Sequence, residues 1–489
     1  MFDQPLLVGA AIAAYVAAQI AIGLYFARNV RSETDYYLAG RRIGWLPIAL
    51  SLFATWFGAE TVMGASAAIA SDGLAGARAE PFGYAITLVA MGYFIAVQFR
   101  ARGYVTLADF FRDRFDRHSE VWVAAIMVIV STIWAAAQLL ALAKVLEGTL
   151  GIDARITLVV ATAVVVVYTS FAGIIGDIVT DVVQSVVLII GMFVILAALV
   201  HHFGGVDAML ATIETSQLTL LGEGESWIGQ IDSWAIPILG SLITQEAMSR
   251  FLSARDAPTA RRASFAAAGL YLLLGGVPLL IGLVGVHLMP VGDDPDTFLP
   301  LLAAKLLPPV LLLVFMGALM SAILSTTDSN LLSVSSFVSV NLLSRFHARA
   351  SEATRARTAR ITTVAAGLAA YLIASSGQTI YELIALTSVW GQAGILVAVL
   401  IGLWSSYGGK RAALWAIIAC VIVNLWTLAA APLAAAMADG AALGAALGLL
   451  VAGEAPTMEG YFLVSIAASL IAYVIGAEID KRSRAAAVI

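Results

Sequence analysis

Carboxylates inside apolar segments are the residues of this 489-residue sequence that are best placed to do chemistry. Glu60, Asp181 and Asp328 stand within such segments, and Glu382 stands near the start of another. A charged side chain at the centre of a bilayer costs about 2.5–3.5 kcal/mol on insertion scales, so an acid at this depth usually has a function. We therefore take these acids as candidates for binding a cation or carrying a proton.

Hydroxyl groups surround Asp328. The run from Ser325 to Asn330 reads Ser-Thr-Thr-Asp-Ser-Asn, and its spacing places Ser325 and Asp328 on the same face of a helix. Hydroxyl and carboxylate oxygens are the ligands that a hard cation such as Na⁺ requires, and Asp181 could add a second carboxylate. Hydroxyl groups alone would more often bond to the carbonyls of their own helix. The adjacent acids favour a cation site.

Aromatic residues are the third set of candidates. Trp56 lies in the run Thr-Trp-Phe-Gly-Ala-Glu, Tyr84 follows Pro-Phe-Gly, and Trp134 lies in the middle of an apolar segment. Ring faces that line a cavity attract cations. A single membrane tryptophan is more often a packing residue or an interfacial anchor. The combination of rings with acids favours a binding cavity.

Thirteen apolar segments carry these residues, and each is predicted to be a transmembrane helix. Isolated strands would leave backbone groups unpaired in hydrocarbon. Because 61% of the residues are hydrophobic and 12% are charged, we expect one all-α polytopic membrane domain, 1–489, in contact with lipid. The predicted spans are 5–27, 45–70, 81–99, 120–148, 156–175, 178–202, 233–253, 263–288, 301–343, 358–376, 380–404, 411–431 and 460–480.

The distribution of Lys and Arg predicts the orientation of these spans. All but four of the 27 basic residues, Arg250 among them, lie in alternate connections, the exceptions being Arg78, Lys144, Arg155 and Lys305. Cytoplasmic connections are enriched in basic residues. The N-terminus is therefore expected outside and the C-terminus in the cytoplasm, with the protein in the plasma (inner) membrane. No basic face suited to nucleic acid remains.

Two spans are expected to be interrupted. The spans 45–70 and 233–253 each combine glycine with polar residues at membrane depth. They are the first spans of two blocks of five, about 45–202 and 233–404, which start from opposite sides of the membrane. Broken helices at corresponding positions of inverted repeats mark the binding site of many transporters, although glycine and proline are also ordinary in membrane helices. The spans 5–27, 411–431 and 460–480 would be peripheral, and the stretch 432–456 could be a loop or a re-entrant segment.

Several motifs, taken in their order, resemble those of the sodium:solute symporter family and, within it, the high-affinity choline transporter branch. The resemblance extends over about residues 35–400. It implies a LeuT-type core of two inverted five-helix repeats, alternating access and uptake driven by Na⁺. The motifs are Asp-Tyr-Tyr-Leu-Ala-Gly-Arg-Arg (35–42), Ala-Thr-Trp-Phe-Gly (54–58), Pro-Phe-Gly-Tyr (81–84), Trp-Ala-Ala-Ala (134–137), Thr-Asp-Val-Val-Gln (180–184) and Leu-Ser-Thr-Thr-Asp-Ser (324–329).

The resemblance also implies site residues. For the common sodium site they are Ala54, Phe57 and Ala322, through backbone carbonyls, with the hydroxyls of Ser325 and Thr326. For a second sodium site they are Asp181 and Asp328. The aromatic residues that would enclose the substrate are Trp56, Tyr84 and Trp134.

This sequence departs from the choline branch within the pocket. That branch has a tryptophan at the position of Thr244, a glycine at that of Glu60 and an apolar residue at that of Gln138. Fewer rings weaken the binding of a quaternary ammonium group, whereas a carboxylate could pair with a primary amine, a guanidinium, a hydroxyl or a proton. We expect a small polar solute such as an amine, an amino acid or a related compound. The predicted substrate contacts are Trp56, Phe57, Glu60, Tyr84, Trp134, Gln138, Thr244 and Gln245.

Other functions compete with Na⁺ symport. Coupling to protons is open because Glu60, Asp181 and Asp328 could each carry one. A transporter-like membrane sensor is disfavoured because the sequence ends shortly after Arg484 with no signalling module. The predicted spans carry no His/Glu metal motif and the chain has no nucleotide-binding loop, so we do not expect an enzyme. The single cysteine, Cys420, excludes an internal disulfide.

Overall fold

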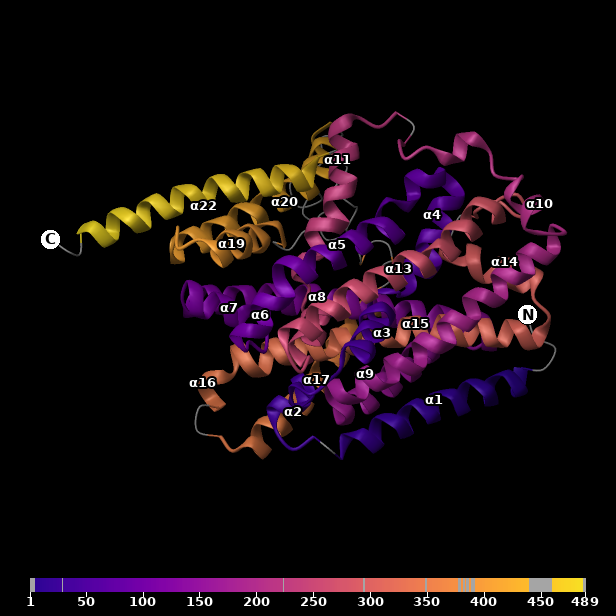
Figure 1. Ribbon diagram of the computed structural model, residues 1–489, viewed down its shortest axis with the longest axis horizontal. Helices are drawn as coiled ribbons and strands as arrows, with labels where there is room; N and C mark the ends of the chain where they lie inside the picture. The colour runs from indigo at the N-terminus through magenta and orange to yellow at the C-terminus, as the bar shows by residue number, and fades with distance from the viewer. Residues whose placement is uncertain are drawn as a thin grey trace.

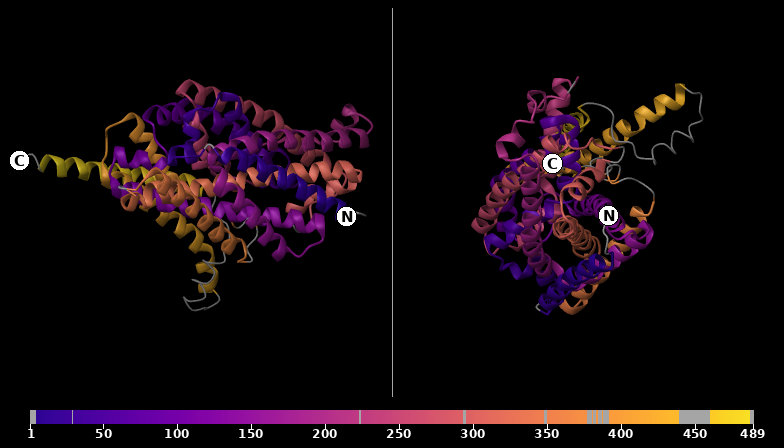
Figure 2. Two further views of the ribbon diagram at one scale, coloured as in Figure 1. Left: turned by 90° about the horizontal axis from the view of Figure 1, so that it is seen from below. Right: turned by 90° about the vertical axis from the view of Figure 1, so that its right-hand side faces the viewer.

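The computed structural model describes residues 5–28, 30–222, 224–292, 295–347, 350–376, 380, 383, 387, 392–438 and 460–486. Within these ranges the regular structure is helical, with an isolated β-bridge between Ile43 and Ala254 and no strand. Most helices run along the long axis of the molecule, and the two chain ends lie at opposite ends of that axis (Figure 1). An end-on view shows the helices packed around one another as a bundle (Figure 2). The all-helical architecture is therefore confirmed.

The helices begin and end as follows. They are α1 (Pro5–Ala27), α2 (Glu33–Leu38), α3 (Trp45–Trp56), α4 (Ala65–Asp72), α5 (Tyr84–Ala90), α6 (Ala96–Arg102), α7 (Leu107–Arg114), α8 (Arg117–Leu150), α9 (Ala154–His202), α10 (Val206–Leu210), α11 (Trp227–Ala235), α12 (Gln245–Ser253), α13 (Ala257–Gly285), α14 (Phe298–Leu306), α15 (Pro309–Ser336), α16 (Ser344–His347), α17 (Glu352–Ala374), α19 (Gln392–Trp404), α20 (Lys410–Ala438) and α22 (Tyr461–Ala486).

Seven helical stretches in the described part of the chain are long and apolar enough to cross a membrane. They are Glu60–Arg102, Arg117–Glu147, Ala154–His202, Ala257–Gly285, Pro309–Leu342, Lys410–Thr427 and Tyr461–Ser483. Three shorter apolar helices accompany them, at Ala10–Phe26, Trp45–Trp56 and Gln392–Trp404. Several of the predicted spans are therefore built from two or more short helical pieces, or share one long helix.

Both predicted interruptions are confirmed. The α3 helix ends at Trp56, and the chain becomes helical again at the π-helical turn η2 (Glu60–Gly64), which continues into α4. The second interruption lies at Thr244, whose extended backbone (φ −70°, ψ 135°) separates the short turn η8 (Ser241–Ile243) from α12. Both breaks leave backbone groups free to bond outside their own helix.

One predicted span was wrong, and one predicted division lies within a few residues of a kink. The single span predicted over 301–343 is divided into α14 and α15 at Leu307, whose backbone is extended (φ −98°, ψ 135°). The residue before a proline disfavours the helical region, and here Pro308 follows. The spans predicted at 156–175 and 178–202 correspond to the two parts of α9, which meet at a kink where Gly173 has a φ of 56° and a ψ of −166°. The stretch 432–456 is helical as far as Ala438, and the rest of it lies outside the described residues.

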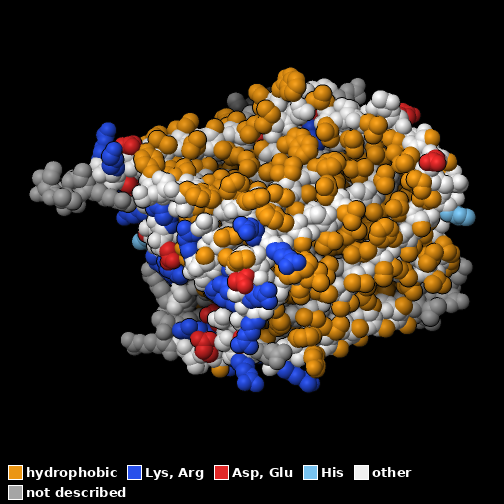
Figure 3. Space-filling view, in the orientation of Figure 1, with side chains coloured by type: hydrophobic (Ala, Val, Ile, Leu, Met, Phe, Trp, Pro, Cys, Tyr) orange, Lys and Arg blue, Asp and Glu red, His pale blue; other side chains and the backbone are white. Residues whose placement is uncertain are grey.

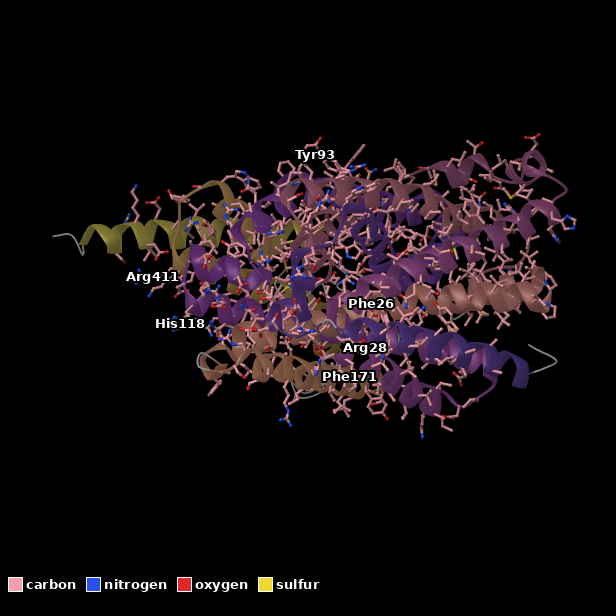
Figure 4. The ribbon with its side chains drawn as sticks, turned by 60° about the horizontal axis from the view of Figure 1, so that its bottom comes forward. Phe26, Arg28, Tyr93, His118, Phe171 and Arg411 are labelled. Atoms are coloured by element: carbon pink, nitrogen blue, oxygen red, sulfur yellow. The ribbon has the colours of Figure 1, made fainter. Side chains whose placement is uncertain are left out.

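Basic side chains gather at one end of the bundle. On the face in Figure 3, Lys and Arg cluster at the left, and apolar side chains cover most of the rest. His118 and Arg411 come from helices far apart in sequence and both lie at that end (Figure 4). The C-terminal end of α22 lies at this basic end, and α1 starts at the opposite end (Figure 1). Basic residues of connections that are far apart in the sequence therefore lie together at one end of the bundle.

An ion pair fastens the connection 203–226 to the bundle. Nη1 of Arg78 lies 2.5 Å from Oε2 of Glu225. Glu225 also accepts hydrogen bonds from the Gly222 N–H (3.1 Å) and the Ser233 hydroxyl (2.9 Å). Burial raises the pKa of the Glu225 carboxyl, but the hydrogen bonds from Arg78, Gly222 and Ser233 lower it by more, so its pKa lies below the ordinary value.

We expect Arg78→Gln to loosen this connection at neutral pH. A partly buried ion pair of this kind contributes about 1 kcal/mol. Because the pKa of Glu225 is lowered in the folded protein, the contribution is present above the ordinary carboxyl pKa and is lost as the pH falls through the lowered pKa. Hydrogen exchange in 204–222 should be faster in the variant at neutral pH and converge with the parent in acid. The control is Arg155→Gln, at an exposed arginine of another connection; equal exchange in both variants would contradict the role of the ion pair.

Candidate substrate and cation sites

The end of α3 provides free backbone oxygens in the middle of the bundle. Phe57 leaves the helical conformation with φ −82° and ψ 55°. The last carbonyls of a helix have no partner within it, so those of Ala54, Thr55 and Trp56 can bond elsewhere. The Trp56 carbonyl accepts the hydroxyls of Thr61 (2.9 Å) and Tyr271 (3.1 Å).

The α15 helix meets α3 at this break. The Thr326 hydroxyl donates to the carbonyls of Thr55 (2.8 Å) and Ala322 (3.1 Å). Gly58 faces the same hydroxyl, because a Cβ built there would lie 2.7 Å from Thr326 Oγ1. The two helix segments that carry the predicted sodium-site residues are therefore brought together, and their carbonyl and hydroxyl oxygens are a donor set that fits Na⁺.

Ser325 points from α15 to a cluster of three buried acids. Its hydroxyl donates to Oδ1 of Asp181 at 2.5 Å. Carboxylate oxygens of Asp177, Asp181 and Asp328 lie within 4.8 Å of one another. The Tyr168 hydroxyl donates to Asp328. The two predicted acids therefore do lie together, joined by Asp177, which stands one helical turn before Asp181.

A guanidinium group lies inside this acid cluster. Nη2 of Arg250 is 2.5 Å from Oδ2 of Asp177 and 3.1 Å from Oδ2 of Asp181. Arg250 also donates to the hydroxyls of Ser51 and Ser329, and its exposed fraction is 0%. It thereby links α12 to α3, α9 and α15. Grouping Arg250 with the basic cytoplasmic connections was wrong, because its side chain is the buried partner of the intramembrane acids.

Aromatic rings from three segments, α3 with its end, α5 and α13, form a second cluster beside the break. The rings of Trp56 and Tyr84 have centroids 5.4 Å apart, and Tyr271 of α13 lies 6.1 Å from Tyr84 and 5.5 Å from Phe57. Phe53 extends the cluster along α3. Two of the three predicted cage aromatics, Trp56 and Tyr84, are thus in contact, and Tyr271 is an addition that the sequence did not indicate.

Carboxylates of two different segments adjoin these rings, and that of Glu60 lies nearby against α8. Glu80 accepts hydrogen bonds from the hydroxyls of Thr61 (2.6 Å) and Tyr271 (2.5 Å). Glu246 accepts one from Nε1 of Trp56 at 3.3 Å. Both acids are buried.

Glu60 faces α8. Nε2 of Gln138 donates to its Oε2 at 2.7 Å, and Oε1 of Gln138 accepts the N–H of Ala59 at 3.3 Å. Trp134 lies one turn before Gln138 on the same face, and its indole N–H is buried without a hydrogen-bond partner in the described part of the chain. Among the described residues, no Lys or Arg forms an ion pair with Glu60 or with the other two acids of this cluster.

The two predicted substrate contacts in the second broken span, Thr244 and Gln245, have different surroundings. The Thr244 hydroxyl donates to the Ser241 carbonyl at 3.3 Å. The Gln245 amide accepts the N–H of Leu107 (2.9 Å) and donates to the carbonyl of Val105 (3.2 Å), so it holds the connection before α7 and is not turned to the rings. Glu382 lies outside the described residues.

Sequence reasoning missed several residues of these clusters. Asp177 could have been found from its spacing, four residues before Asp181 on one helix face. Arg250 and Glu246 have the same spacing, which places the arginine on the face that carries an acid. Glu80 and Tyr271 offered no local signal, because packing of α13 against α3 brings them to the site.

The fold matches those of solved structures of transporters. A Na⁺-coupled sialic acid symporter in a substrate-bound outward-open state superposes with a TM-score of 0.81 over 98% of both chains, at 20% identity. A nucleobase-cation-symport-1 family transporter in a closed conformation gives a TM-score of 0.57 over 93% of this chain and 95% of its own, at 14% identity. The fold is that of the LeuT-type membrane transporters.

The chain belongs to the sodium:solute symporter family, which matches residues 36–420. High-affinity choline transporter 1 of Torpedo marmorata is 31% identical over 382 residues, covering 73% of this chain and 64% of its own. That of Drosophila melanogaster is 28% identical over 401 residues, covering 78% and 63%. The osmoregulated proline transporter OpuE of Bacillus subtilis is 26% identical over 434 residues, covering 85% and 86%.

This chain spans slightly less than two thirds of the length of these choline transporters. The relatives are transporters, so the prediction that the protein is not an enzyme is confirmed, and family membership makes it an integral membrane protein.

Proposed function

We propose that the protein is a Na⁺-coupled symporter that imports a small polar organic solute, an amine, an amino acid or a related compound, by alternating access. The observation that carries this proposal is the contact of the broken end of α3 with α15, where the Thr326 hydroxyl bonds to the Thr55 carbonyl. A Na⁺ ion held by the carbonyls of Ala54, Phe57 and Ala322 and the hydroxyls of Ser325 and Thr326 would join the two helices there.

In this proposal the ion prepares the solute site. Fixing the end of α3 also fixes Trp56 and Phe57, whose rings belong to the aromatic cluster, and Glu60 three residues further on. The proposed molecule has about 13 membrane helices and two inverted repeats, 45–202 and 233–404. The solute would bind at the level of Glu60, between the helix breaks of the two repeats. Rocking of the repeats would then open the site to the other side.

The driving force is sufficient for concentrative uptake. A membrane potential of 100 mV contributes about 2.3 kcal/mol per charge, and a tenfold Na⁺ gradient adds about 1.4 kcal/mol. Together they allow about 500-fold accumulation of a neutral solute per Na⁺. We propose that the protein lies in the plasma (inner) membrane, with its N-terminus outside and its C-terminus in the cytoplasm. This orientation rests on the basic side chains at one end of the bundle, because cytoplasmic connections are enriched in Lys and Arg.

A second Na⁺ beside Asp181 and Asp328 is a further part of the proposal. Three carboxylates in this cluster face one guanidinium, so they keep acceptor oxygens for another cation. Any such ion would share Asp181 with Arg250, and its binding would therefore depend on the position of α12.

The test compares two neighbouring hydroxyls on α15. Thr326→Ala is expected to raise the Na⁺ concentration needed for half-maximal thermal stabilisation by about tenfold, because it removes a ligand that reaches the α3 carbonyls. Thr327→Ala is the matched control, since among the described residues the Thr327 hydroxyl bonds only to the Ile323 carbonyl of its own helix (2.6 Å). Equal Na⁺ dependence in both variants would remove Thr326 from the site.

Proton coupling is the second candidate, because Glu60 and Glu80 lie beside the solute site with no basic partner among the described residues. It predicts stabilisation and uptake that follow pH and are indifferent to replacement of Na⁺ by K⁺.

A further inference from the structure

The charges at the two helix breaks narrow the class of solute, if the proposed transport function holds. Each half-helix that begins at a break carries a carboxylate in its first turn: Glu60 begins η2, which continues through α4, and Glu246 is the second residue of α12. The positive end of a helix dipole stabilises anions at such positions.

In transporters with broken helices, half-helix N-termini often receive the anionic group of the substrate. Here the protein's own carboxylates hold these positions. A solute that carries a carboxylate would meet like charge at both breaks, whereas a cation would be attracted to both.

The hydrogen bonds of these two carboxylates are incomplete. Within 3.5 Å and among the described residues, Glu60 accepts one side-chain bond, from Gln138, and Glu246 accepts one, from Trp56, although an ionised carboxylate has about four acceptor positions. Glu80 differs, because two hydroxyls bond to it at 2.5–2.6 Å. The nearby cation on α12, Arg250, is engaged by Asp177 and Asp181.

The aromatic cluster and α8 give an independent sign of a ligand. Trp56 donates to Glu246 and its ring contacts Tyr84, so ring faces stand next to the acid. On α8, the buried indole N–H of Trp134 has no hydrogen-bond partner among the described residues, and it lies one turn from the glutamine that bonds to Glu60. The site is thus polar, aromatic and incompletely bonded without a guest.

We propose that the solute is a small organic dication with N–H groups, such as a short diamine, whose two cationic groups pair with Glu60 and Glu246. The rings of Trp56 and Tyr84 cover the cationic groups and the chain between them. A quaternary ammonium group cannot donate to the carboxylates, a monoamine pairs with one of them, and an amino acid brings a carboxylate of its own.

The experiment is a thermal-shift titration of the full-length protein in detergent. The probes are diaminopropane, diaminobutane, diaminopentane, butylamine, choline and proline, each in NaCl or KCl at equal ionic strength. One diamine length should stabilise the protein in Na⁺ at concentrations about tenfold or more below those of butylamine, the effect of one additional charge-assisted hydrogen bond. Glu60→Gln and Glu246→Gln should each abolish that advantage, and Glu147→Gln, at an exposed acid of α8, should retain it.

Other results would overturn either the dication or the proposed Na⁺ symport, and the two can be distinguished. Na⁺-dependent stabilisation by proline or choline in preference to every diamine would overturn the dication and leave the symport proposal standing. Equal response to butylamine and the diamines would overturn the pairing with two carboxylates. No difference between Na⁺ and K⁺ with any probe would overturn Na⁺ symport itself, while a diamine response that needs neither ion would support the solute class alone.

Discussion

Replacing Arg250 by methionine is expected to lower the free energy of unfolding by about 3–5 kcal/mol, the cost of removing one partner of a buried ion pair. The side chain has an exposed fraction of 0% and contacts Asp177 and Asp181, so its loss leaves two adjacent carboxylates without a counter-charge. It also removes the bonds from α12 to Ser51 of α3 and Ser329 of α15. The measurement is the midpoint of unfolding in detergent, together with the yield of monodisperse protein.

Companion variants separate charge from packing. Arg250→Lys keeps the charge but loses the planar fork that reaches several oxygens, so its midpoint should lie between those of methionine and arginine. Adding Asp177→Asn to Arg250→Met should recover part of the loss, because one of the unpaired charges is gone. Arg261→Met, at an exposed arginine, should unfold like the parent. A midpoint for Arg250→Met equal to that of Arg261→Met would show that the guanidinium does not hold the acids.

The sequence alone was most informative where a charged residue lies in an apolar segment, because burying the charge there costs free energy. Glu60, Asp181 and Asp328 were found because a charge in an apolar segment needs an explanation, and the structure places each of them in one of the two polar clusters. The break at Phe57 was predicted because a glycine and a carboxylate follow it directly. These signals are local, and a single segment carries each of them.

The remaining parts of the site depend on side-chain reach and on packing between distant segments. Arg250 stands at the cytoplasmic end of its predicted span, where the positive-inside rule assigns it to the surface. Its long side chain instead turns to the acids of α9. Gln245 next to the break looked like a substrate contact, but its amide bonds to the backbone at Val105 and Leu107, which no pattern in its own segment could indicate.

Gly58→Ala is expected to weaken the Na⁺-dependent stabilisation of the protein while leaving it folded. A Cβ at this position would lie 2.7 Å from Thr326 Oγ1 and 3.0 Å from Glu60 Oε2. The methyl group would push the break of α3 away from α15 and displace the Glu60 carboxylate, so the ion site and the solute site would be disturbed together. The Na⁺ concentration for half-maximal stabilisation should rise by about tenfold or more, as for loss of a well-placed ligand.

Gly64→Ala tests whether this effect is specific to the break. Gly64 lies in the helical segment that follows, and a Cβ there meets nothing within 4 Å. Alanine is favoured over glycine inside a helix by about 0.5–1 kcal/mol, so this variant should unfold at or slightly above the parent temperature and keep its Na⁺ response. If Gly58→Ala retained the same Na⁺ response as Gly64→Ala, the gap between α3 and α15 would not be the place where the ion binds. The acid cluster at Arg250, which contacts α3, α9 and α15, would then be the next place to test for coupling between ion and solute.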